Sequence, residues 1–162
     1  MSRNDDLKDL LLRQIADIKK EISSKRTKQL SLDLTEKIVH RLSSFSHECM
    51  ECENYMHILE VNIADIMKVV CQQEQNSLKE YFANLKSITT HLQKKHKLVT
   101  EGYYTGLYMS IGIALGLPLG VVFSQRIGNI GYIGIGLPIG ISIGLSIGAG
   151  LDAKAKKDGL VI

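Results

Sequence analysis

The residues best suited to chemistry lie in the first half of this chain, around Cys49-x-x-Cys52. Cysteine thiolates and histidine rings are common zinc ligands, and His47 and His57 are close to the pair in sequence. Two cysteines three residues apart share one face of a helix. A structural zinc site needs four converging ligands, whereas His57 lies about 140° round a helix from Cys52. We therefore expect no metal and no cofactor, and name Cys49, Cys52 and His57 as the candidate ligands if a metal binds.

The cysteines have two other interpretations. A Cys-x-x-Cys redox pair normally opens a helix in a fold that contains strands, and no strands are evident in this sequence. Structural thiols fit the pattern better. Together with Cys71 the cysteines number three, an odd count in the half that we place in the cytosol, so we do not expect a disulfide framework.

Little else in the first half indicates chemistry. His91 and His96 are candidates for pH sensing, but they lie on a lysine-rich face where we expect them to be solvated. No nucleophile, paired carboxylate or phosphate loop stands out, so we do not expect an enzyme. Residues 1–102 carry sixteen Lys and Arg against fifteen Asp and Glu, and this near balance disfavours a nucleic-acid partner.

Charge divides the chain into parts. Between residues 103 and 151 the only charged side chain is Arg126. We therefore expect a cytosolic helical domain over 1–102, a transmembrane hairpin over 103–151 and a basic cytosolic tail over 152–162. The N-terminus carries acids followed by a helical pattern, which is not typical of a cleaved signal.

Apolar periodicity indicates that the first domain is all-helical, as a bundle or a coiled coil. The first helix is expected over 5–24, and a second after a capping box of Asp33 and Glu36, ending at serines 43, 44 and 46. The apolar faces of these two helices are Leu11, Ile15, Ile18 and Ile22, then Leu34, Ile38, Leu42 and Phe45.

A heptad seam follows, with apolar residues at alternating steps of four and three. Its members are Cys52, Met56, Leu59, Ile63, Ile66 and Val70. The pattern ends in a polar run over 72–76, and a last face consists of Leu78, Phe82, Leu85, Ile88 and Leu92. Two interpretations remain open: two separate helices in a bundle, or one long helix over 47–99 that buries its seam against a partner chain.

The uncharged segments 103–125 and 127–151 are each long enough to cross a hydrocarbon core of roughly 30 Å. Lysines precede the first span and follow the second, against the single Arg126 between them. Because basic residues stay on the cytoplasmic side, we expect both termini to be cytoplasmic. We expect the membrane that this multi-pass protein crosses to be the bacterial inner (plasma) membrane.

Small residues repeat at every fourth position in both spans, which favours close helix packing in lipid. The first row contains Gly112, Gly116, Gly120, Gly136, Gly140, Gly144 and Gly148. A second row lies on the opposite side of each helix: Gly106, Ser110, Ala114 and Pro118, then Gly134, Pro138, Ser142, Ser146 and Gly150. One row suffices for the hairpin partner, so the other predicts contact with a neighbouring copy.

Other residues in the spans bear on function. Pro118 and Pro138 are either hinges or simply small residues in slightly bent helices. Ser110, Ser124, Ser142 and Ser146 would line a pore. Alternating small and large residues also suit a β-hairpin, but two central prolines argue against strands.

The Gly-x-x-x-Gly-x-x-x-Gly pattern and the tail from Gly148 to Lys157 resemble the glycine-zipper membrane proteins, including small bacterial two-helix ones, over residues 106–157. Some glycine-zipper proteins form channels or insert into membranes as toxins, so the resemblance implies a pore or membrane-perturbing role. We expect an all-α protein that binds membrane lipid and forms a homo-oligomer whose hairpins assemble in the bilayer. The alternative is a non-conducting, membrane-anchored scaffold whose residues 1–102 bind a cytosolic protein.

Overall fold

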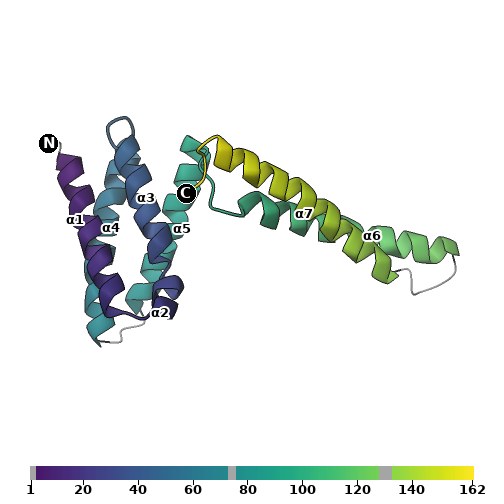
Figure 1. Ribbon diagram of the computed structural model, residues 1–162, viewed down its shortest axis with the longest axis horizontal. Helices are drawn as coiled ribbons and strands as arrows, with labels where there is room; N and C mark the ends of the chain where they lie inside the picture. The colour runs from purple at the N-terminus through teal and green to yellow at the C-terminus, as the bar shows by residue number, and fades with distance from the viewer. Residues whose placement is uncertain (1–2, 73–75, 128–132) are drawn as a thin grey trace. The chain divides into compact units, whose positions relative to one another are not determined.

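The computed structural model describes residues 3–72, 76–127 and 133–162, and these residues form helices and no strand. The all-α fold class is therefore confirmed (Figure 1). The helices are α1 (Arg3–Glu21), α2 (Ser24–Gln29), α3 (Leu32–Phe45), α4 (Met50–Gln72), α5 (Asn76–His96), α6 (Tyr103–Ile127) and α7 (Ile133–Lys157).

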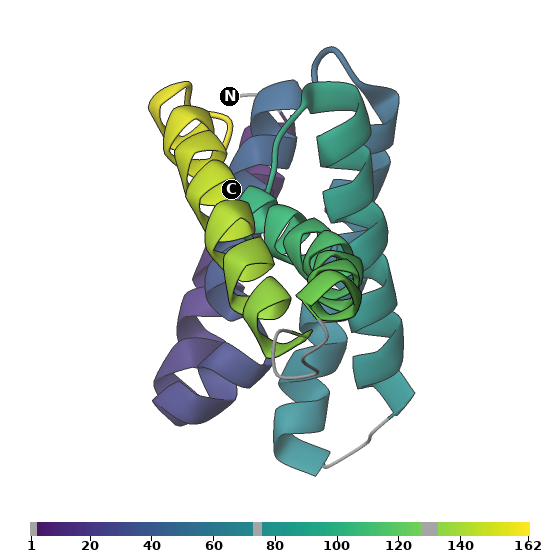
Figure 2. The ribbon, with the colours of Figure 1, turned by 90° about the vertical axis from the view of Figure 1, so that its right-hand side faces the viewer.

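The chain divides into two compact units, residues 1–96 with Ile162 and residues 97–161. In the first unit, α1 packs on α3 and α4, α3 packs on α4, and α4 packs on α5, while α2 is a short connection beside α3. These helices lie side by side as a bundle (Figure 2). Cys52 at the start of α4 lies beside His91 near the end of α5, so the two helices run antiparallel.

The heptad seam faces the interior of this bundle. Cys52, Met56, Leu59, Ile63 and Ile66 are all buried, and the side chain of Val70 lies outside the described part. The long-helix interpretation is wrong, because the segment forms two helices that pack on each other. The described part of the seam is used within the chain, so these residues are not free to form a coiled coil with a partner.

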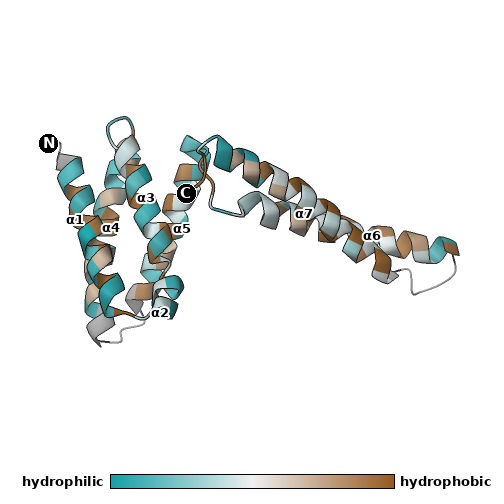
Figure 3. Cartoon of the chain, viewed as in Figure 1, coloured by the Kyte–Doolittle hydropathy of each residue, from teal (hydrophilic) through white to brown (hydrophobic). Residues whose placement is uncertain are grey.

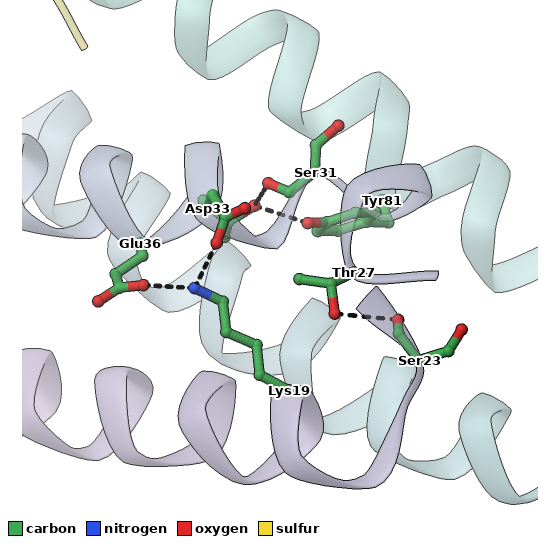
Figure 4. Close-up of polar contacts among 8 residues, drawn as sticks. Lys19, Ser23, Thr27, Ser31, Asp33, Glu36 and Tyr81 are labelled. Atoms are coloured by element: carbon green, nitrogen blue, oxygen red, sulfur yellow. Dashed lines mark hydrogen bonds and ion pairs between the residues drawn. The ribbon is translucent and has the colours of Figure 1, made fainter. Parts of the chain in front are cut away.

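The start of α3 differs from prediction. The sequence predicts that Asp33 caps a helix together with Glu36, but α3 begins at Leu32 after Ser31, which has a φ of 52° and makes no capping bond through its side chain. Asp33 and Glu36 instead hold the Lys19 ammonium of α1, at 2.7 and 2.6 Å (Figure 4). Polar groups of α3 therefore bind α1 rather than their own helix end.

The apolar face of α5 agrees with prediction at Leu85, Ile88 and Leu92, which are buried, but differs near the start of the helix. Tyr81 is fully buried, whereas Phe82 is exposed. The Tyr81 hydroxyl donates to the Leu30 carbonyl at 2.9 Å and lies 2.6 Å from the Thr35 hydroxyl. Burial raises the pKa of Tyr81 to about 12, although the hydrogen bond with Thr35 opposes the shift. A buried tyrosine is tolerated here because its polar end finds partners.

The second unit contains the helical hairpin of α6 and α7. Both helices are long and apolar enough to cross a membrane, and both are mainly white to brown in the hydropathy colouring of Figure 3. Their bounds differ from prediction: Arg126 belongs to α6 rather than to a turn, and α7 extends to Lys157. The polarity of the sequence predicts a turn at Arg126, Gly128 and Asn129, and the last two of these lie outside the described residues.

Candidate functional site

The Cys-x-x-Cys segment meets two histidines from another helix. Cys49 directly precedes α4, and Cys52 lies in its first turn. His91 and His96 come from the end of α5, which packs antiparallel to α4. One ligand atom from each residue lies within 4.8 Å of all the others, so four side chains of types that can bind a metal converge on one point.

Both rings present the same nitrogen to the sulfurs. His91 Nε2 lies 3.5 Å from Cys49 Sγ and 3.4 Å from Cys52 Sγ. His96 Nε2 lies 3.3 Å from Cys52 Sγ. These separations suit either thiol hydrogen bonds to ring nitrogens or four ligands around one ion.

Neighbouring groups hold the two rings in place. His91 Nδ1 lies 3.1 Å from a carboxylate oxygen of Glu51. Because a carboxylate acts only as a hydrogen-bond acceptor, Glu51 favours the His91 tautomer that carries its proton on Nδ1 and has a free lone pair on Nε2. His96 stacks on Phe45 with the ring centroids 4.0 Å apart, and Tyr55 lies against His91.

The protonation of the cluster follows from its partial burial. Burial above all, together with the hydrogen bond with Cys49 and the electrostatic influence of Cys49 and Glu51, raises the pKa of the Cys52 thiol to about 12. Burial, His91 and Lys95 lower the pKa of His96. The lowered pKa favours the neutral imidazole of His96, which is the form that binds metals, whereas the raised pKa keeps the Cys52 thiol protonated, so a metal would bind with release of that proton.

The structure gathers a different set of residues from the one that the sequence suggested. His57 does not join the cluster, because it faces another side of α4 and lies 3.3 Å from Glu60. His47 is exposed in the turn before α4. The expectation that His91 and His96 are solvated is wrong, since His91 is buried and His96 half-buried. Their five-residue spacing carried no helical signal that would have revealed this.

In the second unit, the first row of small residues forms the contact between α6 and α7. A Cβ atom placed on Gly112 or Gly140 would lie within 3.0 Å of the carbonyl oxygen of the other residue. Gly116 and Gly136 face each other in the same way. Backbone therefore touches backbone, and any side chain on this face would push the helices apart. The remaining members, Gly120, Gly144 and Gly148, are also buried.

The second row lies on the outer side of the hairpin. All nine of its members, named above, are exposed, and Gly106, Gly134 and Gly150 have open space where a Cβ would be. Pro118 and Pro138 lie inside continuous helices. Ser110, Ser142 and Ser146 are exposed and donate to carbonyls four residues back in their own helices, whereas Ser124 is half-buried.

One contact at the open end of the hairpin was not anticipated. The Asp152 carboxylate of α7 accepts the backbone N–H groups of Tyr104 at 3.0 Å and Thr105 at 2.9 Å. These amides belong to the first turn of α6, whose free N–H groups and positive dipole end favour an anion. The backbone N–H of Val99, five residues before Tyr104, donates to the Leu160 carbonyl at 2.9 Å. Asp152 therefore caps the helix opposite its own.

Comparison of the chain with protein-family models, with curated proteins and with solved structures found no match.

Proposed function

We propose that the chain is an integral membrane protein, anchored by the α6–α7 hairpin and assembled into a homo-oligomer in the bilayer. The observation that carries the proposal is the unequal use of the two small-residue rows. One row holds α6 against α7, and the other faces outward along the whole hairpin.

Exposure of the hairpin supports its insertion. A long apolar helix in the core of a soluble protein is mostly buried, whereas only 11% of the apolar window of α6 and 22% of that of α7 are buried. Leucine, isoleucine, valine and phenylalanine side chains cover the outer faces. In water these faces would form an apolar patch larger than monomeric proteins usually expose, whereas lipid tails would cover them.

Topology follows from the basic residues. Lys94, Lys95 and Lys97 come before α6, and Lys154, Lys156 and Lys157 end α7. Only Arg126 is basic near the other end of the hairpin. This asymmetry supports cytoplasmic termini and a cytoplasmic bundle.

Assembly through the second row follows from the physics of helix association in lipid. Lipid tails are as apolar as leucine side chains, so helices associate where small residues allow their backbones to approach. The exposed row on α7 repeats the four-residue spacing of the buried one. A second copy of the hairpin offers the complementary surface, and the buried heptad seam offers none.

We further propose that the assembly does not conduct. The hydroxyls of Ser110, Ser142 and Ser146 donate to carbonyls of their own helices at 2.8 Å, so they can face lipid or a neighbouring helix without water. The function is then that of a membrane-anchored scaffold that presents the helical bundle to a cytosolic partner. The alternative is a pore lined by these serines and Ser124.

The test compares the two rows in liposomes. Wild type is expected to crosslink into oligomers and to leave the liposomes impermeable to dye and ions. Ser142→Leu, which fills the outer row, should abolish crosslinking and leave the helical content unchanged. Ile143→Leu, on the exposed ridge beside it, is the matched control and should behave as wild type.

Either part of the proposal can fail separately. A wild-type chain that stays monomeric at every protein-to-lipid ratio would exclude assembly. Leakage that appears with wild type and disappears with Ser142→Leu would exclude the scaffold and establish the pore.

A further inference from the structure

We propose that Cys49, Cys52, His91 and His96 bind one zinc ion as a structural centre of the helical bundle. The four ligand atoms are the two Sγ atoms and the two Nε2 atoms that converge between the start of α4 and the end of α5. This inference concerns the first unit alone and does not depend on insertion or assembly of the hairpin.

The distances suit a tetrahedral ion. Zinc bonds of about 2.3 Å to sulfur and 2.0–2.1 Å to nitrogen place tetrahedral sulfur and nitrogen ligands roughly 3.5 Å apart. Three of the four sulfur-to-nitrogen separations in the cluster are 3.3, 3.4 and 3.5 Å. All pairs lie within 4.8 Å, so small side-chain movements complete the tetrahedron.

The surroundings also fit a metal centre. A histidine that binds a metal through one nitrogen usually donates its other N–H to a carboxylate, which fixes the ring and its tautomer. Glu51 occupies that position, 3.1 Å from His91 Nδ1. Stacking on Phe45 orients the ring of His96. Two thiolates also neutralise the charge of Zn²⁺, which lowers the desolvation cost of partly burying the ion.

The donor set argues for zinc and for a structural role. Calcium and magnesium prefer oxygen ligands, and the cluster offers sulfur and nitrogen. A two-iron cluster divides its ligands between two metal atoms, whereas these four atoms meet at one point. Four protein ligands leave no open position for substrate, which is typical of structural rather than catalytic zinc.

Zinc at this point would tie together segments far apart in sequence. Cys49 and His96 are 47 residues apart, and the helices between them are antiparallel neighbours. His96 is the last residue of α5, so binding holds that helix end against α4. The rival state is a Cys49–Cys52 disulfide, which would remove both sulfur ligands.

The experiment uses the full chain, purified in detergent under reducing conditions. Wild type is expected to contain about one zinc ion per chain by elemental analysis. Cobalt substitution should give the visible absorption of tetrahedral Co²⁺ together with thiolate-to-cobalt charge transfer. This spectrum is measured on the unmodified chain, so it does not depend on whether a ligand variant folds.

Variants assign the ligands. Cys52→Ser and His96→Gln should each lose the zinc and the thiolate-to-cobalt spectrum. His57→Gln, on the same helix, and Cys71→Ser are the matched controls and should keep both. Glu51→Gln should still bind zinc, with an affinity lower by about 10–100-fold, because it removes the group that orients His91.

The outcomes that overturn the proposal are equally definite. Wild type that takes up neither zinc nor cobalt after reduction excludes the site. The redox pair is established instead by three results together. The intact mass of the non-reduced chain is lower by two hydrogens, the cross-link maps to Cys49 and Cys52, and the reduced chain binds no metal. Zinc retained by both Cys52→Ser and His96→Gln places the ion elsewhere.

Discussion

Lys19 links two helices through a single charge. Its ammonium lies between the carboxylates of Asp33 and Glu36, so α1 is tied to the first turn of α3. The hydrogen bond and charge of Lys19 lower the pKa of Asp33. Burial opposes the charge of Lys19, but the hydrogen bonds to both carboxylates outweigh it, and the pKa of Lys19 is raised.

This arrangement predicts a difference in acid stability. Because the pKa of Asp33 is lowered by folding, its contribution is fully present above the ordinary value of 3.8 and is lost as pH falls through the lower folded value. Lys19 has the opposite sign, and its contribution is lost only as pH rises above 10.5. Lys19→Met should therefore be less stable than wild type at pH 7, and the difference should shrink below pH 4.

Urea unfolding of the two chains across this pH range measures the difference directly. Lys68→Met removes an exposed ion pair within α4 and serves as the control, with little effect at any pH. A difference between wild type and Lys19→Met that is constant down to pH 2 would contradict the assignment.

Asp152 is a second residue whose effect should exceed that of a surface charge. Asp152→Ala leaves the N–H groups of Tyr104 and Thr105 without their acceptor, so we expect a loss of about 0.5–2 kcal/mol in hairpin stability. SDS titration followed by circular dichroism measures that loss. Asp158→Ala, in the exposed segment after α7, should change stability by less than about 0.5 kcal/mol. Equal effects of the two variants would exclude the cap.

Neither role could be predicted from sequence, because each depends on a distant neighbour. Asp33 and Glu36 have the spacing of a capping box, but Lys19 lies close enough to bind both. The sequence places Asp152 at the start of a basic tail. In the structure α7 continues past Asp152, and the Asp152 carboxylate contacts the first turn of α6. Local patterns identify which residues can form a cap and do not identify which helix they cap.

At the scale of helices, periodicity predicted much of what is observed. The buried faces of α1 and α4 agree with their heptad-like steps, and the first glycine row forms the predicted contact. The cluster of Cys49, Cys52, His91 and His96 could not be predicted in the same way. It depends on α4 and α5 being antiparallel and on their register, which places residue 52 opposite residue 91.

The two glycine rows on α7 predict opposite effects from the same substitution. Gly140→Ala puts a Cβ within 3.0 Å of the Gly112 backbone, so the helices must separate. We expect the hairpin to lose about 1–3 kcal/mol of stability, as in other overpacked sites. Gly150→Ala enters open space and should be neutral or stabilising by up to about 1 kcal/mol, because alanine favours helix. SDS titration of both variants measures the difference, and equal effects would contradict the contact.

On the scale of the whole molecule, the two units are stabilised by different interactions. The first unit is a bundle with a buried apolar core and a Cys/His cluster inside it. The second has an interface of glycine backbone, and its large apolar side chains mostly face outward. Stability of the first should therefore depend on water, pH and metal, whereas stability of the second should depend on lipid or detergent.

Chelation should separate these contributions in one experiment. An ion present at about a thousand times its dissociation constant adds roughly 4 kcal/mol to folding, which for a unit of this size corresponds to on the order of 15–30 °C in Tm. A strong chelator should therefore lower the melting transition of the bundle in the full, detergent-solubilised chain. The transition of the hairpin should stay where it is, because no residue of the cluster belongs to that unit.

Circular dichroism with matched detergent and reductant follows both transitions, and the Gly140→Ala chain identifies the one that belongs to the hairpin. His96→Gln should melt near the chelated wild type and show no further response to chelator. A chelator that lowers both transitions equally would mean that the two units unfold together. A chelator without effect on a zinc-loaded chain would mean that the ion contributes nothing to the fold, and the cluster would then need a role other than structure.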